Sequence, residues 1–373
     1  MFMEFKVTPW EVEGIVDYQK LIEEFGTTPI DEKMLERIKK DFGELHLFLK
    51  RKIFFSHRDF DMILDRIEKN QKFALYTGRG PSGHTHLGHI MPWIFTKYLQ
   101  DKTKANLYFQ LTDDEKFLHE REMTIEETHR FAYENALDVI AVGFDPERTF
   151  IFSDIDYAKT LYNIAIKVAK KVTFSTVKAV FGFENSTNIG MIFYPSIQAA
   201  PCFLPSILEN EKIPVLIPAA IDQDPYWRVT RDVAEKIGYY KPTAIHCTLL
   251  PSLQGASGKM SASDPDSAIF TVDTEEDVRR KVRNAFTGGR TSLKEQRELG
   301  GDPEVCSVFL YLYYLFEEDD TKIEERRKNC LNGDIICGEC KAYLTEKIIR
   351  FLKEHQKRRE KAKDVIEDFL LKD

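Results

Sequence analysis

Short apolar runs alternate with amphipathic segments through the middle of the chain. Apolar runs rich in β-branched and aromatic residues predict strands at 73–77, 106–112, 149–154, 215–221 and 243–250. Between these runs, apolar positions recur at helical spacing and predict helices. Strands that are apolar on both faces and alternate with helices indicate a parallel sheet covered by helices on each side. We therefore expect an α/β domain here.

Three capping boxes mark helix starts, because a Ser or Thr is followed three positions later by an acidic residue. They are Ser56 with Asp59, Thr124 with Glu127, and Thr274 with Asp277. Before Ser56 the chain is charged, and it holds two short amphipathic segments that each end at a glycine, 17–26 and 31–43.

Near residue 270 the strand signals stop, and the remaining chain reads as helical. The changes in pattern predict three parts. They are a leader at 1–55, a Rossmann-like α/β domain at 56–270 and an all-helical domain at 271–373.

Composition narrows the class of protein but not its chemistry. The 373 residues suffice for two or three domains, and 43% hydrophobic with 31% charged residues is typical of a soluble globular protein. The formal net charge of −8 disfavours indiscriminate nucleic-acid binding, although a local basic patch for one RNA stays open. No apolar run approaches the roughly 20 residues of a membrane span, and no secretory signal is visible. We expect a cytoplasmic protein without membrane contact.

A glycine-rich turn follows the first of these strands. Gly78, Gly80 and Gly83 match G-x-G-x-x-G, in which glycines let backbone N–H groups approach phosphate at a helix N-terminus. A nicotinamide site would also need a lone acidic residue about 20 positions later, at the end of the second strand. Here that strand ends later, with three consecutive acidic residues. The turn alone is therefore weak evidence.

Three histidines follow the turn, at His84, His86 and His89. A metal site and a packing role are both open, although no cysteine or acidic ligand stands beside them. Taken as a unit, H-x-G-H favours a nucleotide. Gly88 leaves room for a flat purine, and the imidazoles of His86 and His89 can donate to phosphate oxygens.

A second signal lies far away in the chain, in the Gly/Ser-rich loop 255–263. Lys259 is a mobile cation there, and it can meet the negative charge that builds on a departing pyrophosphate. Without the H-x-G-H segment, a solvated surface loop would be the better interpretation.

Together, H-x-G-H after the first strand and K-M-S-x-S after the last resemble the class I aminoacyl-tRNA synthetases. Other stretches resemble the tryptophanyl-tRNA synthetases of the archaeal and eukaryotic cytosolic type. They are VTPWEVEG, IFFSHRD, LYTGRGPSG, LTDDEKFL, FIFSD, IQAAP, AIDQDPYWRVTRD, SGKMSASDPDSAIF and TGGR. At Ala262 many class I enzymes carry a second lysine, but alanine is known in this branch. The resemblance implies a class I synthetase fold, with a Rossmann-like parallel sheet and a C-terminal helical domain that binds the anticodon.

The resemblance also implies a two-step reaction. The carboxylate of tryptophan attacks the α-phosphorus of ATP and releases pyrophosphate, and the terminal ribose of tRNA(Trp) then takes the acyl group. The implied partners are tryptophan, ATP and tRNA(Trp), and the implied assembly is a homodimer. Mg²⁺ is expected to bridge phosphate oxygens, with no metal held by protein residues.

The resemblance also implies site residues, each assigned by its position in these motifs. The implied catalytic phosphate donors are His86, His89 and Lys259. The implied ATP-binding residues are Arg79, Gly80, Gly88, Met260, Ser261 and Ser263. The implied tryptophan-binding residues are Tyr76, Gln110, Glu115, Gln198 and Gln223. The first two of these are the implied partners of the indole N–H, and the other three of the α-ammonium.

The nearest rival function is that of a tyrosyl-tRNA synthetase, which shares the fold and a similar lysine loop. A phenol pocket tends to hold an acidic partner, so the neutral Gln110 favours tryptophan. A non-catalytic RNA-binding module is a second alternative, but it would not need the histidine and lysine elements.

Weaker features remain in the leader and in the helical part. Residues near Trp10 resemble a leader segment that folds over the active site, although anchoring of a charged tail is as good an interpretation. Arg290 matches a position used near the anticodon, whereas Thr291 departs from the acidic residue of eukaryotic relatives. The basic run 355–361 either touches tRNA phosphate or is the solvated face of a helix.

Six cysteines do not make a disulfide scaffold, so inert thiols are the default. Cys337 and Cys340 form C-x-x-C, with Cys330 seven residues earlier. A zinc site would need a fourth ligand, and no histidine lies close. A surface disulfide is the other alternative.

Overall fold

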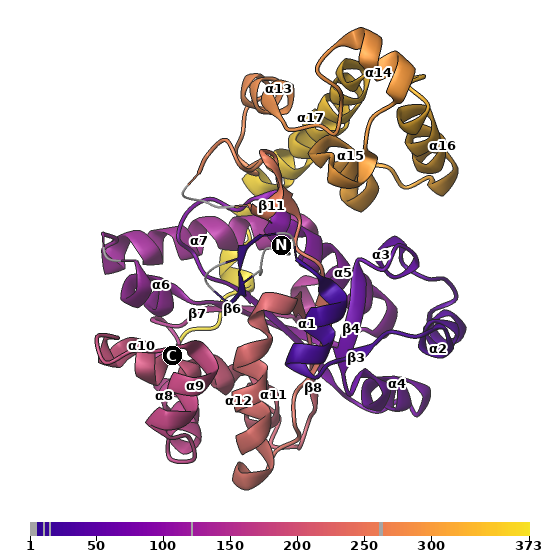
Figure 1. Ribbon diagram of the computed structural model, residues 1–373. Helices are drawn as coiled ribbons and strands as arrows, with labels where there is room; N and C mark the ends of the chain where they lie inside the picture. Colours follow the sequence, from indigo (N-terminus) through magenta and orange to yellow (C-terminus); the bar gives the residue numbers. More distant parts are fainter. Residues whose placement is uncertain (1–5, 10–11, 15, 121, 261–263) are drawn as a thin grey trace.

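The computed structural model describes residues 6–9, 12–14, 16–120, 122–260 and 264–373 (Figure 1). In this part of the chain the main sheet has seven strands, in the order β3-β4-β9-β8-β5-β6-β7. Their bounds are β3 (Thr28–Pro29), β4 (Phe54–Arg58), β5 (Ala74–Arg79), β6 (Asn106–Leu111), β7 (Thr149–Ser153), β8 (Val215–Ala220) and β9 (Thr243–Cys247). The strands from β9 to β7 are parallel, which confirms the predicted parallel sheet.

Two strands near the start of the chain extend this sheet, and only β4 runs opposite to the parallel strands. β4 pairs antiparallel with β9, and β3 pairs antiparallel with β4. The sequence pattern did not predict either strand. Ser56 was expected to cap a helix, but it lies inside β4.

The predicted capping box at Ser56 is therefore wrong, although the helix after it, α4 (Phe60–Glu68), is present. The Ser56 hydroxyl is hydrogen-bonded to His246 Nδ1 at 3.1 Å, and the Asp59 carboxylate accepts from Arg231. His57 Nδ1 instead accepts the first N–H of α4, from Phe60, at 3.2 Å. Ser56 and Asp59 thus have partners distant in the sequence, and His57 caps α4 in place of Ser56.

Helices cover the two faces of the sheet. One hydrophobic core lies under α2 (Glu32–Phe42), α3 (Leu47–Lys50), α4, α5 (Leu87–Thr103) and α7 (Ile125–Val142). A second core lies under α8 (Ala158–Ala169), α9 (Phe174–Phe181), α10 (Ile189–Ala199), α11 (Leu204–Leu208) and α12 (Asp224–Ala234). The capping box predicted for α7 is confirmed, since the Glu127 N–H donates to Thr124 Oγ1 at 3.2 Å.

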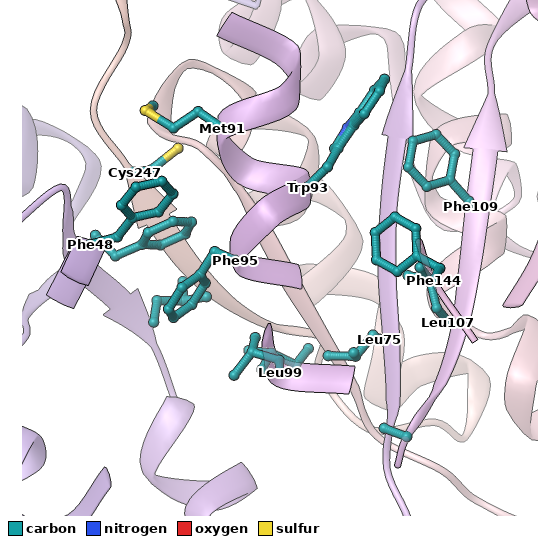
Figure 2. Packing of buried hydrophobic residues seen from close by; sticks show 14 of the residues in the cluster. Phe48, Leu75, Met91, Trp93, Phe95, Leu99, Leu107, Phe109, Phe144 and Cys247 are labelled. Carbon is teal, nitrogen blue, oxygen red and sulfur yellow. The ribbon is translucent and has the colours of Figure 1, made fainter. Parts of the chain in front are cut away.

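Alternate residues of each central strand enter opposite cores, as the pleat requires. Leu75 and Leu107 belong to the first core, whereas Tyr76 and Tyr108 belong to the second. Figure 2 shows the first core, where Trp93 of α5 stands edge-on to Phe109 of β6 with ring centroids 5.2 Å apart.

The helical part stands beside one end of the sheet (Figure 1). It comprises α13 (Glu275–Asn284), α14 (Leu293–Leu299), α15 (Ser307–Tyr311), the π-helix η6 (Leu312–Phe316), α16 (Asp320–Leu331) and α17 (Cys337–Ala362). The third capping box is confirmed at α13. The long helix α17 packs along α7, where His355 Nε2 lies 2.9 Å from Asp138 Oδ1. The chain end then returns to the sheet, because the Leu371 N–H donates to the Ile151 carbonyl of β7.

Smaller elements complete the description. They are β1 (Lys6–Val7), β2 (Val12–Glu13), α1 (Tyr18–Phe25), α6 (Asp113–His119), β10 (Pro251–Ser252), β11 (Gly255–Lys259) and the 3₁₀ turns η1 (Pro146–Arg148), η2 (Ala200–Cys202), η3 (Ile221–Gln223), η4 (Glu235–Ile237), η5 (Pro303–Val305) and η7 (Ile366–Asp368). β10 and β11 form an antiparallel hairpin where the sequence predicted only a loop. Among the described helices, none is long and apolar enough to cross a bilayer.

Candidate active site

A cavity of about 440 Å³ opens at the carboxyl ends of β5, β6 and β8. Ligands of open α/β sheets bind at this edge, because loops and helix N-termini meet there. Nine of the predicted site residues line the cavity, namely Arg79, Gly80, His86, Gly88, His89, Glu115, Gln198, Gln223 and Met260.

The two distant motifs meet at this cavity. A Cβ on Gly88 would stand 3.0 Å from the His86 ring, which it would crowd, and 3.5 Å from Met260 Sδ, which is ordinary van der Waals contact. Leu87 and Met260 belong to the same buried cluster. The Thr271 N–H also donates to the Thr85 carbonyl at 2.9 Å, which ties the chain after the lysine loop to the start of α5.

The paired histidines lie at the N-terminus of α5. The rings of His86 and His89 stack with centroids 3.6 Å apart, and the His86 backbone N–H donates to His89 Nδ1 at 3.2 Å. Because Nδ1 accepts this bond, a neutral His89 carries its proton on Nε2 and can donate it to a ligand. The helix N-terminus adds positive potential, so the arrangement suits an anion.

Two further cations border the same region. Arg79 is buried, and burial lowers its pKa to about 10, against Glu115 and Asp138, which raise it. Its Nε and Nη2 atoms are buried without a hydrogen-bond partner among the described residues. Buried N–H groups without an acceptor destabilise the folded protein unless a bound ligand accepts their hydrogen bonds. Lys116 also lines the cavity, and it passes so close to Gly80 that a Cβ there would stand 2.2 Å from Lys116 Cε.

A hydrogen-bonded chain of neutral side chains lies at the other end. The Tyr76 hydroxyl donates to Gln110 Oε1 at 2.5 Å and accepts from Gln198 Nε2 at 2.7 Å. Gln110 Nε2 donates to both oxygens of Asp154, at 2.8 and 2.9 Å. This pairing fixes the amide so that its oxygen, not its nitrogen, faces Tyr76. Tyr76 and Gln110 are fully buried and stand behind the cavity wall.

The carboxylate that orients Gln110 has an unusual proton affinity. Burial raises the pKa of Asp154 well above its usual range, and the neighbouring Asp114 raises it further. The pKa of Asp114 is raised as well, first by burial, and the two carboxyl groups are hydrogen-bonded to each other. One proton shared between them relieves the repulsion of two buried like charges.

Other predicted residues stand apart from this cavity or cannot be placed. The backbone of Lys259 ends β11 and pairs with Pro251. Its side chain, together with Ser261, Ser263 and Trp10, lies outside the described residues. Arg290 is exposed in the helical part, where its Nε donates to the Gly300 carbonyl at 2.8 Å.

The sequence analysis missed Lys116, Asp154 and Trp227 as site residues. Lys116 lies in α6, the helix that begins just after β6 ends, and its place shortly after a strand end was a usable signal. Trp227 lines the cavity, with its ring 5.5 Å from that of Tyr76 and its indole nitrogen buried without a partner among the described residues. From the leader, Pro9 also lines the cavity and accepts from Gln223 Nε2 at 3.3 Å.

Comparisons with known proteins agree on one family. Residues 68–353 match the family model described as tRNA synthetases class I (W and Y). The chain is 58% identical to a tryptophan–tRNA ligase of Pyrococcus abyssi, over 99% of this chain and 94% of that protein. It is 54% identical to one of Pyrobaculum aerophilum, over 99% of this chain and 98% of that protein.

Solved structures give the same result. A tryptophanyl-tRNA synthetase from Giardia lamblia superposes with a TM-score of 0.89 at 38% identity, covering 95% of this chain and 96% of that chain. One from the archaeon Aeropyrum pernix gives 0.88 at 34% identity, covering 96% and 97%. The chain belongs to the class I tRNA synthetases, in the tryptophanyl-tRNA synthetase family.

Proposed function

We propose that this chain activates L-tryptophan with ATP and transfers it to the 3′ end of tRNA(Trp). In the first step a carboxylate oxygen of tryptophan bonds to the α-phosphorus, and the bond to pyrophosphate breaks. In the second, a ribose hydroxyl of the tRNA loses its proton and takes the acyl group, and AMP leaves. The observation that carries the proposal is the meeting of the H-x-G-H segment with Met260 at one cavity.

The nucleotide end supplies positive groups rather than a nucleophile. His86, His89 and Lys259 are the proposed donors to the phosphates, and Arg79 adds a buried guanidinium whose unpaired N–H groups a phosphate would satisfy. Stabilising charge that develops on the leaving pyrophosphate is the main catalytic effect of such donors.

Mg²⁺ is proposed to travel with the nucleotide. When bound, it would neutralise phosphate charge. The proposed phosphate contacts on this chain are histidine, arginine and lysine, which suit phosphate oxygens and leave the ion to be held by ATP itself.

The other end fits an indole. Indole offers one N–H donor and no acceptor. The Tyr76 hydroxyl and Gln110 Oε1 each keep a lone pair beyond the hydrogen bonds described above, so either can accept that N–H. Phenylalanine would leave this site unpaired, at a cost of about 1–3 kcal/mol. Glu115, Gln198 and Gln223 are the proposed partners of the α-ammonium.

Amino-acid-dependent pyrophosphate exchange tests the proposal against its rivals. We expect exchange with tryptophan and none with tyrosine, since the acceptor that Tyr76 contacts at the indole end is the neutral amide of Gln110 and not a carboxylate. Exchange that tyrosine supports equally well would favour the tyrosyl enzyme. Failure to form any adenylate would leave a non-catalytic RNA-binding module.

The helical part and the dimer are further proposals. We propose that residues 271–373 bind the anticodon end of the tRNA through Arg290, and that the chain works as a cytoplasmic homodimer. Exposed apolar side chains on α8 and α10 support a subunit contact, with Tyr162 55% and Ile189 84% exposed. Sedimentation should show a dimer, and Ile189→Glu should shift it toward monomer if these helices form the contact.

A further inference from the structure

Four of the six cysteines converge in the helical part. Cys306, Cys330, Cys337 and Cys340 line one void of about 20 Å³. They come from separate places: the residue before α15, the end of α16, and the first turn of α17. All four are free thiols. The sequence analysis singled out Cys330, Cys337 and Cys340 by their spacing, and the structure places Cys306 beside them.

Hydrogen-bond donors surround these sulfurs. The Phe309 N–H donates to Cys306 Sγ at 3.4 Å, and Arg326 Nη1 donates to Cys340 Sγ at 3.4 Å. Donors of this kind favour the thiolate, which is the form that binds metal.

Positive charge lies close to the same thiols. Arg326 contacts Cys340 directly. The N-terminus of α17, a helix of 26 residues, carries the C-x-x-C pair. These charges would offset the excess negative charge of a metal bound by four thiolates.

We propose that Cys306, Cys330, Cys337 and Cys340 form a four-thiolate site for a thiophilic metal, as one Zn²⁺ or as an iron–sulfur cluster. Both use four cysteines, with two of them spaced as C-x-x-C. Within the described residues, no three Cys, His, Asp or Glu side chains already stand where they would jointly hold one ion. A single Zn²⁺ therefore requires the thiols to rotate toward the void, whereas a cluster spans sulfurs that lie farther apart.

The site would brace the loop that carries Arg290. A Cβ on Gly289 would stand 2.4 Å from Cys337 Sγ, so the loop backbone lies against the thiol cluster. The Arg290 N–H donates to Gln296 Oε1, and its Nε donates to the Gly300 carbonyl. Loss of the metal should therefore loosen this loop and the start of α17, and leave the cavity at the sheet unchanged.

Metal content tests the site independently of the reaction. The full chain, purified without chelator and without oxygen, should contain about one zinc ion or about four iron atoms with sulfide per chain. Cys306→Ser and Cys340→Ser should lose the metal, whereas Cys202→Ser, which alters a buried thiol of the α/β part, should keep it.

A second readout needs no variant. Cobalt added to the reduced, metal-free chain should give intense sulfur-to-metal charge-transfer bands. Absence of zinc, iron and cobalt binding in the reduced chain would overturn the proposal, as would metal content that Cys306→Ser leaves intact. A Cys337–Cys340 disulfide in protein that never takes up metal would also overturn it.

The consequence for tRNA rests on the proposed function. Removal of the metal should raise the KM for tRNA several-fold and leave tryptophan-dependent pyrophosphate exchange unchanged. If exchange itself is absent in protein that holds the metal, the proposed function fails and the metal site stands.

Discussion

The two ends of the cavity differ in how far their polar atoms are already paired. At the indole end, Tyr76, Gln110 and Gln198 form a closed hydrogen-bond chain that Asp154 anchors. At the nucleotide end, two nitrogens of the buried Arg79 have no partner among the described residues. At the indole end the hydrogen bonds are therefore formed before the ligand binds, whereas at the nucleotide end the ligand supplies the missing hydrogen-bond acceptors.

This difference separates selectivity from rate. A fixed set of acceptors rejects a ligand that lacks the matching donor, because the loss of a buried hydrogen bond is not recovered elsewhere. Unpaired cationic donors act instead where charge develops during the reaction. Changes at the indole end should therefore affect the KM for tryptophan, and changes at the nucleotide end should affect ATP and the rate of adenylate formation.

The largest effect is expected from Lys259→Ala. Loss of a cation that meets the leaving pyrophosphate should slow adenylate formation about a hundredfold or more, with tryptophan binding little changed. Pyrophosphate exchange and equilibrium tryptophan binding measure the two quantities. Lys241→Ala, at a half-exposed lysine that pairs with Glu235 at 3.3 Å, is the matched control. A Lys259→Ala enzyme that works at full speed would refute this role.

Arg79→Met is expected to act next most strongly. The variant loses charged hydrogen bonds to phosphate, so the KM for ATP should rise about 10- to 100-fold. Thermal stability should stay equal or increase, because a buried and incompletely paired charge is removed. Steady-state kinetics and a melting curve check both parts. An unchanged KM with a lower melting temperature would make Arg79 a structural residue.

Gln110→Ala tests the indole end directly. Without its acceptor the KM for tryptophan should rise about tenfold, which corresponds to about 1.4 kcal/mol, in the range of about 1–3 kcal/mol for a lost buried hydrogen bond, while the KM for ATP stays nearly constant. Titration of each substrate at saturating levels of the other measures this split. Equal losses for both substrates would remove Gln110 from the indole site.

Asp154→Asn should have the smallest effect and a distinctive pH dependence. In the native chain the raised pKa of Asp154 and Asp114 means that one proton is shared at lower pH. Stability from this pair is present below its raised pKa and is lost as the pH rises through it, because a second buried charge then appears.

Tryptophan binding should therefore weaken with rising pH, by a few-fold. Asp154→Asn should remove most of this dependence while raising the KM modestly, because the Gln110 amide is then free to turn. Isothermal titration calorimetry of tryptophan binding at several pH values measures this pH dependence in both proteins. The same slope in both proteins would show that another group titrates.

Local features of the fold could be read from the sequence, and partners distant in the sequence could not. The caps at Thr124 and Thr274 depend on residues within one helical turn, so the pattern predicted them correctly. Ser56 carries the same local signal, but its hydroxyl pairs with His246 of β9, and that contact exists only in the folded chain.

The same limit applies to the site. Sequence motifs identified four residues that line the cavity in the structure, namely His86, Gly88, His89 and Met260. Their catalytic and binding roles stay predictions. Asp154 was missed because its importance comes from pairing with Gln110 on the neighbouring strand, 44 positions earlier. Cys306 was missed for the same reason, since it joins the other three thiols only through the packing of the helical part.

Hydrogen–deuterium exchange tests the account most directly, because it reports on both motif segments in one experiment. With tryptophan present, a non-hydrolysable ATP analogue should slow exchange in peptides covering 78–90 and 255–264 together, at the same analogue concentration. Protection of only one of these segments, with the other exchanging as it does without nucleotide, would show that they do not share a bound triphosphate.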